Sequence, residues 1–195
     1  MKRRSFDVVV SIVGLGLAAL LIVAGGLLTW AHNFVTDEVR TQLSAQQIFF
    51  PPKGSSAIAG PEFAQMRQYA GQQLTTGAQA QVYADHFIAV HLKEVGGGQT
   101  YAQLSTKAQA DPTNLKLQGQ VATMFKGETL RGLLLNAYAF GTMGTIAGIA
   151  ALCAFISGSA MLALGALGLW HSRRVEDDVE LLTPHNARPA EPVHV

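Results

Sequence analysis

Residues 132–170 read GLLLNAYAFGTMGTIAGIAALCAFISGSAMLALGALGLW, and no Lys, Arg, Asp or Glu occurs between Arg131 and Arg173. As one helix, this tract would extend roughly 60 Å at about 1.5 Å per residue. The hydrocarbon core of a bilayer takes only about 20 helical residues. The tract therefore predicts two successive roles. Residues 145–170 are predicted to form a transmembrane helix, and residues 132–144 are predicted to continue outside the membrane and pack on protein.

A second charge-free stretch lies near the N-terminus. Val8–Trp30 contains no charged residue and follows three basic residues at positions 2–4. Its Leu, Ile and Val side chains favour bilayer insertion by roughly 4–8 kcal/mol in sum, so residues 8–31 are predicted to form a transmembrane helix. A cleaved signal peptide is the alternative, with Thr29–Ala31 as the cleavage site. It is disfavoured because signal peptides use an apolar region of about 7–15 residues.

Basic residues flank both predicted spans on the same side. Positions 2–4 precede the first span, and Arg173 and Arg174 follow the second. The positive-inside rule keeps such segments in the cytoplasm. We therefore expect residues 1–7 and 171–195 to be cytoplasmic and residues 32–144 to be extracytoplasmic, in a multi-pass protein of the plasma membrane. The polar, proline-containing tail is expected to be disordered.

The composition of the chain supports a membrane protein and excludes some partners. Only 14% of the 195 residues are charged, against about a quarter in soluble domains. The formal net charge of +1 and the absence of a Lys/Arg cluster with interleaved aromatic residues argue against binding to nucleic acid. The single cysteine, Cys153, lies inside the apolar tract and is expected to fill space rather than to react.

Apolar residues recur at helical spacing through residues 32–144. No helix breaker occurs before Ile48–Pro52, so the first helix is expected to continue to residue 45 and to end before the two prolines. Phe49 and Phe50 are expected to fill a core rather than to rest on the membrane. Further helices are predicted at 61–74, 78–95, around 101–108, and from Asp111 into the tract. The predicted fold class is therefore all-α integral membrane, a two-helix transmembrane hairpin with a helical extracytoplasmic domain.

Small residues recur at four-residue spacing in both predicted spans. Such rows let two helix backbones approach closely in lipid. Either the rows seat the two spans against each other, which is the favoured interpretation, or one row stays free to bind a partner membrane protein or a second copy of the chain. The predicted helix-packing residues are Gly14, Ala18, Gly144, Gly148, Ala151, Ala154 and Gly158.

No pattern of residues predicts a catalytic, cofactor or metal site. A non-haem iron centre needs two histidines and a carboxylate, and the nearest candidates are Asp85, His86, His91 and Glu94. The two histidines are five residues apart, about 140° around an α-helix, whereas ligand pairs on a helix need a spacing of three or four. We therefore expect no metal, no cofactor and no catalytic residue.

One charged pair stands immediately before the tract. Glu128 and Arg131 are three residues apart, a spacing at which helical side chains meet. We expect either a local ion pair, worth at most about 0.5 kcal/mol when exposed, or contact of Arg131 with lipid headgroups or a partner's carboxylate.

Four stretches resemble one protein family. They are TTGAQA at 75–80, YADHFIAVHL at 83–92, TYA at 100–102 and FKGETLRGLLL at 125–135. With the basic start and the first apolar stretch, they resemble actinobacterial membrane proteins that carry the label aromatic ring-opening dioxygenase, over most of residues 1–170. The resemblance implies an actinobacterial plasma-membrane protein. Some members have a cysteine pair at positions matching Gln65 and Val82, so the disulfide bond that the resemblance would imply is absent here.

These observations favour a non-enzymatic protein of the cell envelope that acts through protein interaction, as a scaffold or accessory subunit. Its expected partners are the lipid bilayer and a membrane protein or a second copy of the chain. A sensor that signals through the acidic cytoplasmic tail is one alternative. A metal-dependent ring-opening dioxygenase is another, and it is disfavoured because the residues offer no ligand set for iron.

Overall fold

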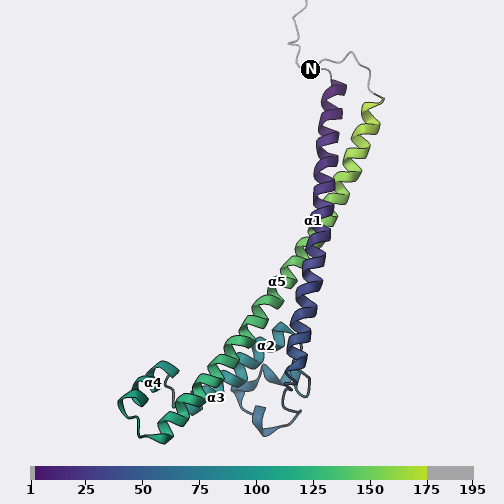
Figure 1. Ribbon diagram of the computed structural model, residues 1–195. Coiled ribbons are helices and arrows are strands. Elements are labelled where there is room, and N and C mark those ends of the chain that lie inside the picture. The colour runs from purple at the N-terminus through teal and green to yellow at the C-terminus, as the bar shows by residue number, and fades with distance from the viewer. Residues whose placement is uncertain (1–2, 175–195) are drawn as a thin grey trace, which may run out of the picture. The chain divides into compact units, whose positions relative to one another are not determined.

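The computed structural model describes residues 3–174, and Figure 1 shows the order of the helices. The predictions for residues 1–2 and 175–195, which include most of the expected disordered tail, lie outside the described residues. The long helices are α1 (Arg3–Ala45) and α5 (Leu115–Ser172). Between them lie η1 (Ser56–Ile58), η2 (Pro61–Phe63), η3 (Met66–Tyr69), α2 (Gly77–Tyr83), η4 (Ala84–Ile88), α3 (Ala89–Val95) and α4 (Tyr101–Ala110). No β-strand occurs in this range, so the all-α class is confirmed for it.

Both long helices join a predicted span to a helical extension. α1 contains no proline and continues through residues 32–45, as the sequence predicts. α5 passes through Gly127 and Gly132 without a break, although each glycine weakens a helix by about 1 kcal/mol relative to alanine. Each helix is long and apolar enough to cross a membrane.

The two ends of α5 differ slightly from the prediction. The side-chain oxygen of Asn114 accepts a hydrogen bond from the Leu117 N–H at 3.1 Å, so Asn114 rather than Asp111 caps the helix. Asp111 instead accepts a hydrogen bond from the Thr113 hydroxyl in the preceding turn. At the other end the helix includes His171 and Ser172, which the sequence assigns to the tail.

The described chain divides into two compact units. One is formed by the ends of the long helices, residues 3–27 and 150–174, and contains no other helix in this range. Its buried side chains are small, as at Ser11, Ala18 and Ala151, whereas its large apolar side chains face outward. This pattern is the reverse of that of a water-soluble helix pair, which buries its large apolar residues.

The second unit, residues 28–149, has a conventional apolar core. Phe50 lies at its centre and contacts the rings of Tyr69 and Tyr83 at centroid distances of 5.3 and 5.4 Å. The expectation for the two phenylalanines is therefore half right, because Phe49 is 56% exposed. The fully or nearly buried residues of this core are Leu43, Phe50, Ile58, Phe63, Met66, Leu74, Ala80, Val82, Ala84 and Leu134.

The predicted helix at residues 61–74 is wrong. This segment forms the two short turns η2 and η3 and then runs extended to Leu74, whose N–H donates to the carbonyl of Ile48 at 2.9 Å. Gly71 adopts a φ of +76°, which an α-helix does not allow. The apolar residues are nevertheless buried, since pairing with residues 48–50 satisfies the backbone in place of helical hydrogen bonds.

The predicted helix at 78–95 is present, but it contains a π-helical turn. α2, η4 and α3 follow one another without a gap from Gly77 to Val95. The start is fixed by a capping box, in which the Thr76 hydroxyl accepts from the Gln79 N–H and the Gln79 side chain accepts from the Thr76 N–H. Inside the core, burial raises the pKa of the Tyr83 phenol above its ordinary value, because the charged phenolate would lose its hydration.

A smaller apolar cluster lies beside α4. Leu104 of α4 is buried with Leu92 of α3 and Met124 of α5. A second capping box, formed by Thr100 and Gln103, fixes the start of α4. The predicted short helix is therefore confirmed, and it covers one side of the first turns of α5.

Gly77 allows α2 to approach the backbone of α5. A Cβ at this position would lie 3.0 Å from the Ala137 carbonyl oxygen and 3.3 Å from the Gly141 Cα. We expect Gly77→Ala to lower the free energy of unfolding by about 1–3 kcal/mol, because backbone atoms cannot move aside as a flexible side chain can. Thermal unfolding of the purified full chain in detergent measures this effect.

Gly132→Ala is the matched control, since a Cβ there would meet no atom within 4 Å. Alanine is a better helix former, so this variant should be neutral or more stable by up to about 1 kcal/mol. Equal melting temperatures for Gly77→Ala and the wild type would show that the close approach contributes nothing.

Candidate functional site

The contact of α1 with α5 in residues 28–149 depends on two glycines of the predicted packing row. The Nδ1–H of His32 donates a hydrogen bond to the Gly144 carbonyl oxygen at 2.7 Å. A Cβ at Gly148 would lie 3.0 Å from the same His32 nitrogen, and one at Gly144 would lie 3.2 Å from the Val35 side chain. The absence of side chains at these positions therefore makes room for α1.

The remaining packing residues lie in the unit formed by residues 3–27 and 150–174. Ala18, Ala151 and Ala154 are buried there. A Cβ at Gly158 would lie 3.1 Å from the Ile22 side chain and 3.3 Å from the Ala18 carbonyl oxygen. Since only α1 and α5 occur in the described part of this unit, these small residues are covered by the other helix.

Gly14 differs from the other predicted packing residues. A Cβ built there would meet nothing within 4 Å. Gly14 instead lines an open groove of about 400 Å³ together with Ser11, Gly165 and Gly168. Near Gly14, α1 instead contacts α5 through Leu15 and Ser11, which lie against Gly165 and Gly168.

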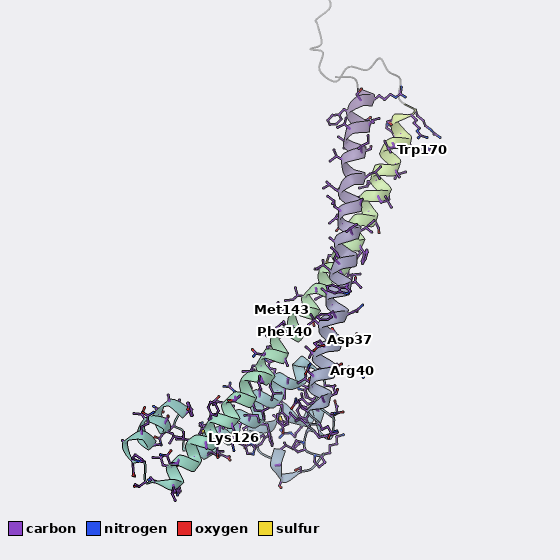
Figure 2. The ribbon with its side chains drawn as sticks, viewed as in Figure 1. Asp37, Arg40, Lys126, Phe140, Met143 and Trp170 are labelled. Carbon is purple, nitrogen blue, oxygen red and sulfur yellow. The ribbon has the colours of Figure 1, made fainter. Side chains whose placement is uncertain are left out.

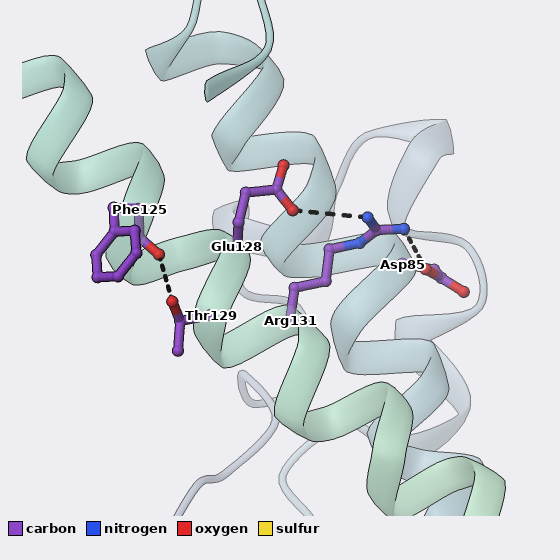
Figure 3. A network of polar contacts seen from close by, with 5 residues as sticks. All are labelled: Asp85, Phe125, Glu128, Thr129 and Arg131. Carbon is purple, nitrogen blue, oxygen red and sulfur yellow. Dashed lines mark hydrogen bonds and ion pairs between the residues drawn. The ribbon is translucent and has the colours of Figure 1, made fainter. Parts of the chain in front are cut away.

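An ion-pair network joins α5 to the π-helical turn η4 (Figure 3). Arg131 donates a hydrogen bond to Asp85 at 3.0 Å and lies 3.7 Å from Glu128. The predicted local pair with Glu128 is thus present, but its geometry is poorer than that of the pair with Asp85, which the sequence did not predict. Spacing could not reveal a partner 46 residues away along the chain. The only signal was a lone carboxylate in an otherwise apolar stretch of helix.

The network leaves one polar atom unsatisfied. Arg131 Nε is buried and has no hydrogen-bond partner within the described residues, although its side chain as a whole is 34% exposed. The terminal guanidinium nitrogens therefore carry the interaction with both carboxylates. The arrangement holds η4 against α5.

The histidines considered for metal binding do not lie in a cluster of possible metal ligands within residues 3–174. His91 Nδ1–H donates to the Phe87 carbonyl oxygen at 2.7 Å, and its ring centroid lies 4.4 Å from that of Phe87, with the two ring planes tilted by 48°. Asp85 is engaged by Arg131. In residues 3–174, no group of three or more His, Cys, Asp or Glu side chains could hold a metal ion.

No protein-family model, curated protein or solved structure matches this chain.

The two carboxylates around Arg131 should contribute unequally to stability. We expect Asp85→Asn to lower the free energy of unfolding by about 1 kcal/mol, because it weakens a charge-assisted hydrogen bond between two segments that are distant in sequence. Glu128→Gln should cost less than about 0.5 kcal/mol, as for exposed pairs at this spacing. Denaturant unfolding of the full chain in detergent compares the two variants. A larger loss for Glu128→Gln would contradict this ranking.

Proposed function

We propose that this protein is an integral membrane protein of the cell envelope that acts by binding another membrane protein or a second copy of itself. In this proposal, residues 8–31 and 145–170 cross the plasma membrane, residues 32–144 form an extracytoplasmic domain, and both termini are cytoplasmic. The protein has no catalytic task and serves as a scaffold or accessory subunit.

The exposure of large apolar side chains on α1 and α5 is the observation that carries the proposal. Water-soluble monomers rarely expose continuous apolar patches larger than a few hundred Å², and each Å² left in water costs about 25 cal/mol. Hydrocarbon removes this cost. The exposed residues include Val9, Ile12, Val13, Leu17, Leu20, Val23, Leu27 and Trp30 of α1, and Met143, Ile146, Ile149, Leu152, Ile156, Leu164, Leu167 and Trp170 of α5.

The ends of the predicted spans fit a membrane interface. Trp30 and Trp170 are both more than half exposed, and exposed tryptophans are enriched at the level of lipid headgroups. Figure 2 labels Trp170 near the end of α5, where the Arg174 guanidinium lies 4.0 Å from its ring centroid. A basic group next to the anchoring ring supports the cytoplasmic assignment of this end.

The small-residue row of α5 is used within the chain, so a partner must bind elsewhere. Outside the predicted spans, Phe125 is 56% exposed and its ring lies 5.8 Å from that of the partly exposed Tyr101. Lipid cannot cover these rings if residues 32–144 lie beyond the membrane. Exposed aromatic pairs are typical of the centres of protein interfaces, so this pair is the contact that we assign to a partner.

Labelling of single cysteines tests the topology. In a Cys153→Ala background, Gln65→Cys should react with a membrane-impermeant maleimide in intact cells, because Gln65 is exposed and lies in the predicted outer domain. The matched control is Ser5→Cys, also exposed, which should react only after lysis. Protection of Gln65→Cys until lysis, or release of the protein by alkaline carbonate, would refute the membrane arrangement.

Site-specific photo-crosslinking tests the interaction. A photoreactive residue in place of Phe125 should give one discrete adduct in cells, identified by mass spectrometry as a membrane protein or a second copy of the chain. The same probe at Lys53, exposed in a loop before η1, should give none. A lone monomer at both positions would count against a scaffold or accessory subunit.

A further inference from the structure

A groove with several polar side chains in its lining lies between α1 and α5 in residues 28–149. It has a volume of about 410 Å³ and is bounded by α1, by the start of α2 and by α5. This volume is within the range of small-molecule sites. The groove borders His32, which directly follows the first predicted span, and Thr145, which begins the second. If the proposed topology holds, the groove therefore opens at the outer surface of the membrane.

Three polar groups of this lining have no partner within the described residues. They are the Arg40 guanidinium, the Thr36 hydroxyl and the Tyr138 hydroxyl, none of which forms a hydrogen bond or an ion pair there. Thr36 and Arg40 are four residues apart on α1 and so share one face of that helix. Tyr138 reaches the same groove from α5.

Other hydroxyls of the groove are already engaged. Thr142 and Thr145 donate to the carbonyl oxygens four residues before them in α5, at 2.9 and 3.0 Å. The Thr76 hydroxyl accepts from the Gln79 N–H. The free hydrogen-bonding capacity of the lining is therefore concentrated around one cation.

The distribution of charge on α1 favours an anion at this groove. Arg40 is the only Lys, Arg, Asp or Glu of the lining. The acidic Glu38 lines a different groove, of about 300 Å³, formed with Phe34, Val39, Ala137 and Phe140; Figure 2 labels Arg40 and Phe140. Asp37, the other nearby carboxylate, is exposed and does not line the groove that contains Arg40.

We propose that this groove binds the phosphate group of a phospholipid, with Arg40 pairing with the phosphate oxygens and the Thr36 and Tyr138 hydroxyls donating to them. Arginine forms two parallel hydrogen bonds with phosphate, which suits the planar guanidinium. A lipid is favoured over free phosphate because the groove borders both predicted spans, and this choice rests on the proposed function.

Lipid binding to the purified full chain in a neutral detergent tests the proposal, with native mass spectrometry as the readout. Three probes are titrated. These are phosphatidylglycerol, a diacylglycerol glycolipid with the same acyl chains and no phosphate, and inorganic phosphate. The wild type should prefer phosphatidylglycerol to the glycolipid by about tenfold.

The variants should separate the site from a general charge effect. Arg40→Gln should weaken phosphatidylglycerol binding by about five- to tenfold, and Tyr138→Phe by about two- to fivefold. The matched control is Lys116→Gln, which removes the same charge from an exposed position on α5 outside the groove. It should change binding by less than about twofold. None of the three variants should alter glycolipid binding.

Three results would overturn the inference. They are equal affinity of Arg40→Gln and the wild type for phosphatidylglycerol, equal affinity of the wild type for the glycolipid, and Arg40-dependent binding of inorganic phosphate without any lipid preference. Resistance of Arg40→Gln to carbonate extraction confirms that this variant is still inserted. If the wild type itself is released by carbonate, the membrane arrangement fails and the lipid site fails with it. If it stays embedded and Arg40→Gln binds normally, only the lipid site fails.

Discussion

The contact between α1 and α5 depends on glycines of α5, because side chains at these positions would collide with α1. At Gly144, Gly148 and Gly158 a Cβ would lie 3.0–3.2 Å from side-chain atoms of α1. In hydrocarbon, two helices gain nothing by burying apolar side chains against each other, because lipid is equally apolar. For the proposed spans, close backbone approach and hydrogen bonds between the helices replace that gain. In the unit of residues 28–149, the hydrogen bond from His32 to the Gly144 carbonyl oxygen, at 2.7 Å, joins the two helices.

A glycine also allows close packing between α2 and α5 in the unit of residues 28–149. Gly77 meets the backbone of α5 at Ala137 and Gly141, so α2 and α5 approach each other through their backbones. The core of residues 28–149 is then completed by ordinary burial, with Leu134 of α5 among the buried residues. Arg131, one turn before Leu134, ties η4 to α5 through Asp85. α5 thus provides the surface on which this domain is assembled.

Periodicity predicted the parts of the fold that are fixed by local sequence. α1, α4 and α5 follow from apolar spacing, capping residues and the absence of breakers. Residues 61–74 show the limit of this argument. Phe63, Met66 and Leu74 have helical spacing and are buried as expected, yet the backbone is extended near Leu74 because it pairs with residues 48–50. A sequence pattern indicates which side chains are buried, but tertiary hydrogen bonds decide the backbone.

The candidate site was predictable to a similar extent. Four-residue spacing identified the glycines and alanines of α5 that lie against α1, because small residues let two helix backbones approach closely. On α1 the same rule chose Ala18, which is buried and lies beside Gly158, and Gly14, which makes no such contact. The rule missed Ser11, Leu15 and Ile22, which also lie against glycines of α5. The pair between Asp85 and Arg131 depends on where two distant segments meet. Neither this ion pair nor the π-helical turn that carries Asp85 can be recognised from a local sequence pattern.

The polar side chains near the outer ends of the spans follow one rule of solvation. A hydroxyl in hydrocarbon must be hydrogen-bonded, and a threonine on a helix can satisfy this need with the carbonyl four residues earlier. Thr142 and Thr145 do so, and their hydroxyls therefore need no further partner. Thr36, Tyr138 and Arg40 make no such bond within the described residues, so they require water or a polar ligand. These three side chains gather in one groove, beside threonines whose hydroxyls are already bonded, so the unmet hydrogen-bonding capacity of this part of the fold is concentrated at one place.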